Sequence, residues 1–214
     1  MLTETLQNFF DAMGVQWVLW LLIGLSIAAV AITIERALFF RARRVDAKAL
    51  SQRIRDALRT DDVEAALQHA RDAGGMEGNV LASGLAALDM GPDAVGEIIQ
   101  SGVATERVAY DKYLSFLGTL GNNAPFIGLF GTVLGIIRSF AELGEATAGA
   151  NRAQLVQAEL AEALVATAAG LLVAIPSVIA YNQFRGAIKA RINRTEAVTR
   201  ELLAHLKSTK PGER

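Results

Sequence analysis

The sequence predicts an all-α polytopic membrane protein with three transmembrane helices and long helical extensions on the cytoplasmic side. Hydrophobic residues make up 52% of the 214 residues and charged residues only 20%, which is apolar for a soluble domain of this size. Three stretches are long and apolar enough to cross a bilayer. The segments between them carry helical rather than strand periodicity, so no sheet is expected.

Residues 1–14 contain no Lys or Arg and therefore lack the basic region of a cleavable signal peptide. Their apolar side chains share one helical face, which predicts an amphipathic helix at the periplasmic membrane surface. Residues 15–35 form the first predicted span. Trp17 and Trp20 anchor one end of it at the interface, and Glu35 closes the other end.

Residues 36–113 predict a cytoplasmic helical domain. Amphipathic patterns indicate helices at 46–58 and 62–71, the second capped by Asp61 or Asp62 and followed by Gly74-Gly75.

A further helix is expected from about Met76 to Met90, ended by Gly91-Pro92. No strong stop signal follows before Gly121. We therefore expect one helix from near Asp93 to Phe140, which at 1.5 Å per residue would be roughly 70 Å long.

Residues 114–140 form the second predicted span. Its small residues recur at spacings of three and four, which places them on one helical stripe. The stripe consists of Gly118, Gly121, Pro125, Gly128, Thr132, Gly135 and Ser139. Such a seam in lipid serves either close helix approach or a wet, polar lining. The proline predicts a kink between Gly121 and Pro125.

Residues 141–160 are expected to be a short periplasmic loop, and residues 161–184 the third span. This span has its own small stripe, made of Ala163, Thr167, Gly170, Ala174 and Ser177. Pro176 removes a backbone hydrogen bond and is expected to loosen or kink the helix. Residues 185–214 continue as a basic cytoplasmic helix. Because the Lys and Arg residues gather at 36–113 and 185–214, the positive-inside rule places the amino terminus in the periplasm and the carboxyl terminus in the cytoplasm.

Two hydroxyls stand out where the second and third spans form an antiparallel hairpin. With the loop centred near Gly149, residues whose numbers add to about 300 share one depth, and Thr132 and Thr167 meet this condition. Both lie on the small seams, somewhat to the outside of the bilayer centre. They could support a water chain or a partner's carboxyl group. Alternatively, each bonds to its own helix carbonyl and serves packing only.

The same arithmetic places Glu162 level with Arg138. Charged groups within a span are costly and mark functional sites by default. We hypothesise that Glu162 lines an outward-facing aqueous vestibule and pairs with Arg138. The alternative is that both side chains extend to the headgroups, and Glu159 is read as an interfacial residue.

Several chemistries have no support in the sequence. There is no cysteine, no phosphate-binding loop, no metal motif and no acid–base or nucleophile pair, so we expect neither an enzyme nor a cofactor, and no nucleic-acid partner. No Asp, Glu or His occurs between Phe116 and Ser139 or between Ala163 and Phe184. A proton path through these spans would have to take its acid from another subunit.

The stretches GNNAPFIGLFGTVLGIIRSF and AEALVATAAGLLVAIPSVIAYNQF resemble the signature of the MotA/TolQ/ExbB proton-channel family, nearest to its ExbB and TolQ members. The resemblance implies an inner-membrane homopentamer that encircles two copies of a single-span ExbD- or TolR-like partner, whose membrane aspartate carries the proton. It assigns pore roles to Thr132, Thr167 and Glu162. The secondary candidates come from the residue pattern and not from the resemblance; they are Arg138, Gly128, Gly135, Pro125 and Pro176.

The resemblance implies a subunit that converts proton motive force into mechanical work on envelope proteins. TonB-dependent transport, Tol-Pal and a gliding-type motility motor remain open as the client system, and Na⁺ remains an alternative to H⁺. A membrane scaffold that conducts no ions is the alternative from another functional class.

Overall fold

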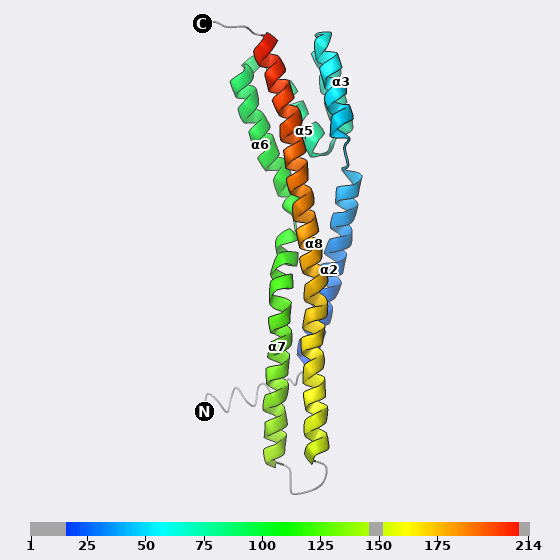
Figure 1. The fold of residues 1–214 in the computed structure, drawn as a ribbon, viewed down its shortest axis with the longest axis vertical. Helices are drawn as coiled ribbons and strands as arrows, with labels where there is room; N and C mark the ends of the chain where they lie inside the picture. Colours follow the sequence, from blue (N-terminus) through cyan, green and yellow to red (C-terminus); the bar gives the residue numbers. More distant parts are fainter. Residues whose placement is uncertain (1–15, 146–151, 210–214) are drawn as a thin grey trace. The chain divides into compact units, whose positions relative to one another are not determined.

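The structure is a computed structural model that describes residues 16–145 and 152–209, so the interfacial helix predicted at 1–14 lies outside the described residues. Within these ranges every regular element is helical, which confirms the all-α prediction (Figure 1). The helices are α2 (Gln16–Ala42), α3 (Ala47–Arg59), α4 (Val63–Ala73), α5 (Gly75–Leu85), the 3₁₀ turn η1 (Leu88–Met90), α6 (Pro92–Asp111), α7 (Leu114–Glu145) and α8 (Arg152–Thr209).

The chain divides into two compact units. One comprises Met1–Ile34 and Tyr113–Asn182, and the other Glu35–Lys112 and Gln183–Arg214; we call them the membrane unit and the polar unit. In the part of the chain that the structure describes, three helical stretches are long and apolar enough to cross a bilayer, within Gln16–Arg59, Leu114–Ala141 and Gln157–Ala204. They correspond to the three spans that the sequence predicts.

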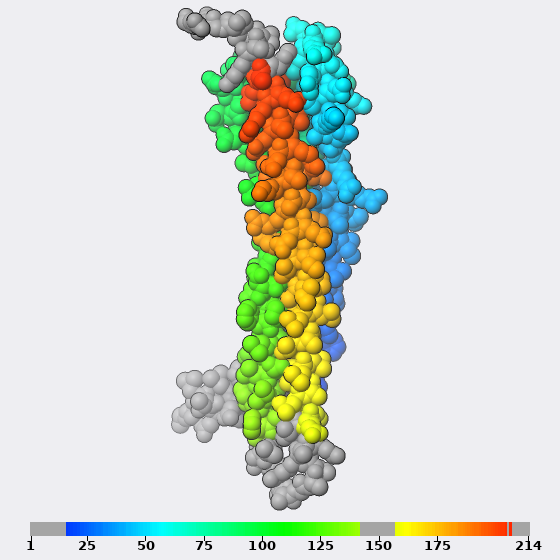
Figure 2. All heavy atoms as spheres, viewed as in Figure 1, coloured from blue at the N-terminus to red at the C-terminus, as the bar shows by residue number. Residues whose placement is uncertain are grey.

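The membrane unit buries small side chains of α7 and α8 together with some large ones such as Leu117, while many other large apolar side chains are exposed. Ala124 of α7 and Ala166 of α8 are fully buried, whereas Phe126 and Leu172 are 67% and 74% exposed. Large apolar side chains gain nothing by leaving lipid, so packing between helices depends on close backbone approach. The membrane-unit parts of α7 and α8 accordingly lie side by side in direct contact (Figures 1 and 2).

The polar unit follows the amphipathic patterns closely. The Asp46 carboxylate accepts hydrogen bonds from the backbone N–H groups of Lys48 and Ala49 at the start of α3. Asp62, rather than Asp61, caps α4 by accepting from the N–H of Ala65 at 2.9 Å. Each cap satisfies donors that the first helical turn leaves unpaired.

The helix expected from Met76 to Met90 is shorter in the structure. Helix α5 ends at Leu85 and is followed by η1. A Cβ on Gly84 would lie 2.9 Å from the Ile99 side chain of α6. The chain has to turn before Met90 so that α6 can pack on this glycine.

The prediction of a single helix from Asp93 to Phe140 is wrong. Helix α6 ends at Asp111 and α7 begins at Leu114, with Tyr113 between them at a φ of 63°. A non-glycine residue in this left-handed region is uncommon and interrupts the helix. The break coincides with the boundary between the two units.

Helix extends into both ends of the predicted loop at 141–160, because α7 continues to Glu145 and α8 begins at Arg152. Helix α8 joins the third span and the basic carboxyl-terminal helix into one element of 58 residues, as the sequence suggests. Pro125 lies inside α7 and Pro176 inside α8, and neither ends its helix.

Replacement of Gly128 by Ala should destabilise the membrane unit. The added Cβ would lie 2.6 Å from the Ala166 carbonyl oxygen, and because this neighbour is backbone, the two helices would have to separate. We expect a loss of about 1–3 kcal/mol in the free energy of unfolding. Reversible denaturation of the full chain in detergent, followed by circular dichroism, measures it.

Gly24→Ala is the matched control, because a Cβ on Gly24 would meet nothing within 4 Å. Alanine is the better helix former, so this variant should be neutral or more stable by up to about 1 kcal/mol. Equal effects of the two substitutions would show that the close approach at Gly128 does not limit stability.

Candidate functional site in the α7–α8 hairpin

The register of the hairpin is set by glycines of α7 that touch α8. A Cβ added at each would meet a neighbour on α8 at van der Waals distance or closer. The contacts are Gly118 with Tyr181, Gly121 with Val178, Gly128 with Gly170, and Gly135 with Ala163. The residue numbers of each pair add to 298 or 299, close to the 300 expected from the sequence. Residues at equal depth in α7 and α8 can therefore be identified from their numbers.

The closest approach of the two helices lies beside Thr167. A Cβ on Gly128 would be 3.0 Å from the Thr167 Cα and 3.2 Å from the Gly170 Cα. A Cβ on Gly170 would in turn lie 2.6 Å from the Ala124 carbonyl oxygen. Gly128 and Gly170 thus let the two backbones meet where the sequence places the paired hydroxyls.

The two threonine hydroxyls differ in their hydrogen bonds. Thr132 is buried, and its hydroxyl donates to the Leu129 carbonyl of its own helix at 2.6 Å. Thr167 is half-buried, and its enclosed hydroxyl oxygen has no hydrogen-bond partner among the residues that the structure describes. The Thr132 hydroxyl proton is therefore used in a hydrogen bond to its own helix, as the packing alternative expects. The Thr167 hydroxyl retains its full capacity to donate and accept.

A small cavity of about 160 Å³ in the membrane unit relates the level of the two threonines to the end of the first span. Ile34, the last apolar residue before Glu35, lines it together with Pro176 and Ser177 of α8. If the hydrocarbon begins at Ile34, its midplane lies about ten residues away along each helix, since half of roughly 30 Å is about 15 Å. On this assumption Thr132 and Thr167 lie about ten residues from the boundary, and their depth in a bilayer stays a prediction.

The charged residues lie towards the loop end of the hairpin. The Nε of Arg138 is 3.6 Å from a carboxylate oxygen of Glu159, and the Glu159 side chain is largely buried. The ion pair observed thus involves the glutamate that the sequence assigns to the interface. Glu162, the expected partner, lies one turn further along α8 and is half-exposed.

The remaining secondary candidates occupy packing positions. Gly128 and Gly135 are buried against α8. Pro125 is half-buried in α7, whereas Pro176 is exposed on α8 beside the cavity that Ile34 shares. Their contacts are those of residues that allow or loosen close helix packing.

Comparison with known proteins agrees with this arrangement. Residues 72–197 match the model of the MotA/TolQ/ExbB proton channel family, well over half of the chain. This chain belongs to the MotA/TolQ/ExbB proton channel family. Its membership makes it a membrane protein of a family of transport proteins rather than of enzymes.

Relatives in this family carry two kinds of name. The chain is 32% identical over 209 residues to the Tol-Pal system protein TolQ of Haemophilus influenzae, which covers 88% of this chain and 87% of the relative. It is 32% identical over 206 residues to the biopolymer transport protein ExbB of Neisseria meningitidis, covering 89% and 90%. A 43% match to TolQ of Pseudomonas aeruginosa covers 107 residues, about half of each chain.

A buried ionic cluster in the polar unit was missed by the sequence reasoning. Glu77 of α5 is fully buried, with one carboxylate oxygen 3.8 Å from Arg191 and the other 3.6 Å from Arg194. These distances are ion pairs rather than hydrogen bonds. A glutamate on a weakly amphipathic helix is expected at the surface, so no sequence signal identified Glu77 as buried.

Arg191 is the centre of this cluster. Its guanidinium donates to the backbone carbonyls of Phe40, at 2.8 Å, and Arg43, near the end of α2. It also donates to the Tyr110 hydroxyl at 3.3 Å. The charge lies 5.2 Å from the centre of the Tyr110 ring, which adds a cation–π contribution. One side chain of α8 thus joins α2, α5 and α6.

The hydroxyl of Tyr110 titrates within this cluster. Burial raises the pKa of Tyr110 because the phenolate would be poorly solvated, and the nearby Arg191 charge opposes this effect only in part.

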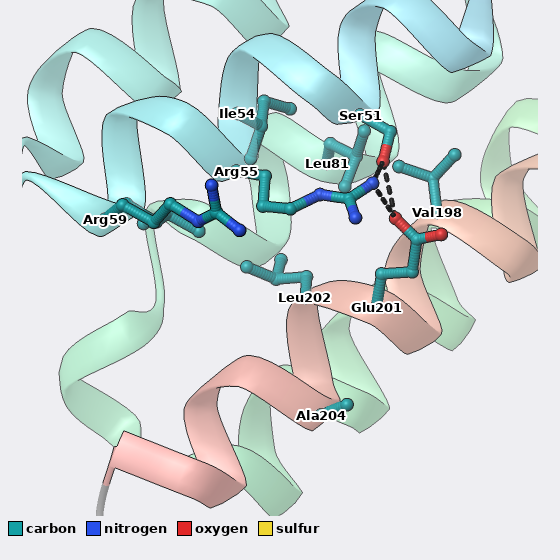
Figure 3. A pocket seen from close by; sticks show the side chains of 10 residues that line it. Ser51, Ile54, Arg55, Arg59, Leu81, Val198, Glu201, Leu202 and Ala204 are labelled. Atoms are coloured by element: carbon teal, nitrogen blue, oxygen red, sulfur yellow. Dashed lines mark hydrogen bonds and ion pairs between the residues drawn. The ribbon is translucent and has the colours of Figure 1, made fainter.

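A second polar contact joins α3 to α8. Glu201 accepts hydrogen bonds from the Ser51 hydroxyl at 2.5 Å and from Arg55 at 3.0 Å. Both α3 side chains point towards Glu201 in a pocket of about 340 Å³, whose remaining lining residues are apolar except for Arg59 (Figure 3). The pair is half-exposed and contributes little to stability. Its position indicates that it orients α3 on α8.

Arg191→Met should strongly destabilise the polar unit, since it leaves the buried Glu77 carboxylate with Arg194 as its only ion-pair partner among the described residues. Loss of one member of a buried pair costs about 3–5 kcal/mol. Chemical denaturation of the full chain in detergent measures the effect, with Arg200→Met as the control because Arg200 is 79% exposed. An effect of Arg191→Met below that of a double Glu77→Met/Arg191→Met variant would contradict this explanation.

Tyr110→Phe should change how stability depends on pH in alkaline solution. Since the pKa of Tyr110 is raised in the folded state, its contribution is present below the unfolded value of about 10 and is lost as pH rises through the folded value. Phenylalanine cannot ionise. The free energy of unfolding should therefore fall less steeply above pH of about 10 in the variant than in the wild type, and parallel curves would disprove the assignment.

Proposed function

We propose that this chain is the channel subunit of a proton-driven energiser, and that the midplane of the α7–α8 hairpin lines the proton path. Membership of the proton channel family and relatives named TolQ and ExbB support the general role. The observation that carries the specific proposal is the enclosed, unpartnered hydroxyl of Thr167, level with Thr132.

The chemistry of the spans requires a second protein. Neither span two nor span three contains Asp, Glu or His over the stretches 117–138 and 164–183. A hydroxyl can donate to a carboxylate and accept from a carboxylic acid, but at ordinary pH it does not hold the transported proton itself. We therefore assign the proton carrier to a carboxylate on a single-span partner similar to ExbD or TolR. Two such helices inside a homopentameric ring of this chain form the proposed assembly.

The charged end of the hairpin fits the entrance to this path. The Arg138–Glu159 pair and the half-exposed Glu162 lie near the loop, on the side that the charge distribution places in the periplasm. In this proposal Glu162 lines an outward-facing vestibule in which protons exchange with water. Arg138 and Glu159 neutralise each other, which lowers the cost of keeping both near the hydrocarbon.

The free energy released per transported proton limits the mechanical work that the subunit can do on an envelope protein. Moving one proton through about 100 mV supplies about 2.3 kcal/mol, so a large rearrangement of an envelope protein needs several protons per cycle. We propose that the subunit sits in the inner membrane with its amino terminus in the periplasm. Its client is a TonB- or TolA-like protein, since the relatives bear the names of biopolymer transport and Tol-Pal proteins.

A scaffold that conducts no ions is the second candidate. The hydrogen bond of Thr132 to the Leu129 carbonyl and the glycine contacts along α7 are what helix packing alone requires. The two candidates differ in what removal of the hydroxyls does, because a scaffold has no flux to lose.

Thr167→Ala should reduce proton flux at least tenfold in vesicles that contain the chain together with its single-span partner, and Thr132→Ala should reduce it less, because that hydroxyl already donates to its own helix. A pH-sensitive dye inside the vesicles measures flux under an imposed potential. Thr33→Ala is the control, since the Thr33 hydroxyl donates to the Ala29 carbonyl of α2 outside the hairpin. Unchanged flux in all three variants, with normal assembly, would favour the scaffold.

A further inference from the structure

A basic groove of about 580 Å³ lies in the polar unit, between the end of α2 and the part of α8 that follows Asn182. Four of its eleven lining residues are arginine and none is acidic. The lining consists of Ala37, Phe40, Arg41, Arg44, Val45, Gln183, Phe184, Ala187, Ala190, Arg191 and Arg194. The groove is separate from the α7–α8 hairpin, and its charge serves no role in the proposed proton path.

The four arginines are not equally available. Arg191 is buried and donates to backbone carbonyls and to Tyr110. Arg194 makes an ion pair with Glu77 but leaves about half of its side chain exposed, so some of its N–H donors remain open. Arg41 and Arg44 are exposed, and among the described side chains no carboxylate lies within ion-pair distance of either.

Part of the groove lining is apolar, and we call this part its floor. The rings of Phe40 and Phe184 lie 5.2 Å apart, centre to centre, and Ala187 and Ala190 add methyl groups beside them. Guanidinium groups over an apolar floor suit a ligand that has an anionic end and a hydrocarbon body. A small, fully hydrated anion would leave this floor unused.

The position of the groove along α2 narrows the ligand further. Ala37 follows Ile34, the last residue before the charged Glu35, by three residues, and Arg41 follows Ile34 by seven, which corresponds to about 5 and 10 Å along the helix axis. The headgroup layer of a bilayer occupies about the same depth beyond the hydrocarbon. Arginine side chains near a span end extend back towards this layer.

We propose that this groove binds the phosphate headgroup of an anionic phospholipid. Arg41 and Arg44 donate to the phosphate oxygens, with Arg194 completing the cationic rim, because a guanidinium matches phosphate geometry with paired N–H donors. Phe40 and Phe184 cover the glycerol end of the lipid. Basic pockets between spans on the cytoplasmic side bind anionic headgroups in this way, and the inference requires only insertion in a membrane, not ion conduction.

The test uses the full chain in nanodiscs of phosphatidylcholine that contain a small fraction of photoreactive phosphatidylglycerol. After illumination, mass spectrometry identifies the labelled peptides, and unlabelled lipids compete for the site. In the wild type we expect labelling of residues 37–45 and 183–194, displaced by phosphatidylglycerol and not by phosphatidylcholine. Since each surface Arg contributes about 1 kcal/mol to anionic lipid binding, Arg41→Gln/Arg44→Gln should weaken the apparent affinity about 30-fold.

Arg53→Gln/Arg59→Gln is the matched control. It removes the same charge from two exposed residues of α3 that do not line the groove, and it should retain wild-type labelling. Both double variants should keep wild-type helicity and melting temperature, since none of the four side chains is buried. Equal loss of labelling in the two variants would overturn the site.

Three other outcomes would also overturn the proposal. Labelling of the groove by a photoreactive phosphatidylcholine to the same extent would show that the charge is not recognised. Displacement by millimolar inorganic phosphate would identify free phosphate as the ligand. Cross-links from the groove to a second copy of the chain, in place of lipid, would identify a subunit contact.

Discussion

The close approach of α7 and α8 at Gly128 and Gly170 is the constraint on which the membrane unit depends. Lipid provides no hydrophobic driving force between helices, so the two backbones have to come together through small residues. Once these two glycines meet, the register of the whole hairpin follows, from Gly118 beside Tyr181 to Gly135 beside Ala163. The same contact encloses the Thr167 hydroxyl without giving it a partner.

The polar unit solves a different problem, because its helices bury their apolar faces away from water. Amphipathic helices slide easily on a purely apolar core, whereas a buried charge with directional partners allows few arrangements. Arg191 supplies this restriction by contacting Glu77, Tyr110 and carbonyls near the end of α2. Helix α8 contributes to both units, with small residues that pack against α7 in its first half and the buried Arg191 in its second half.

This division of labour suits a proton-driven subunit. Residues 117–138 and 164–183 offer hydroxyls and close packing but no Asp, Glu or His. In the proposed assembly the proton carrier therefore belongs to a partner, and the membrane unit supplies the lining. The charged residues Arg138, Glu159 and Glu162 lie towards the loop end of the hairpin. The arginine-lined groove belongs to the polar unit, where we propose that it binds a lipid headgroup.

The sequence by itself determined the class of fold, the three spans, the hairpin register and the family, because length, hydropathy and small-residue spacing are local properties. It also predicted a cap at Asp61 or Asp62, of which the structure shows Asp62. The break at Tyr113 and the burial of Glu77 could not be predicted. Neither has a local signal: the break has no glycine or proline, and Glu77 is buried only because Arg191, more than a hundred residues later, reaches it. Only the tertiary structure decided which glutamate pairs with Arg138, since Glu159 and Glu162 differ by a single helical turn.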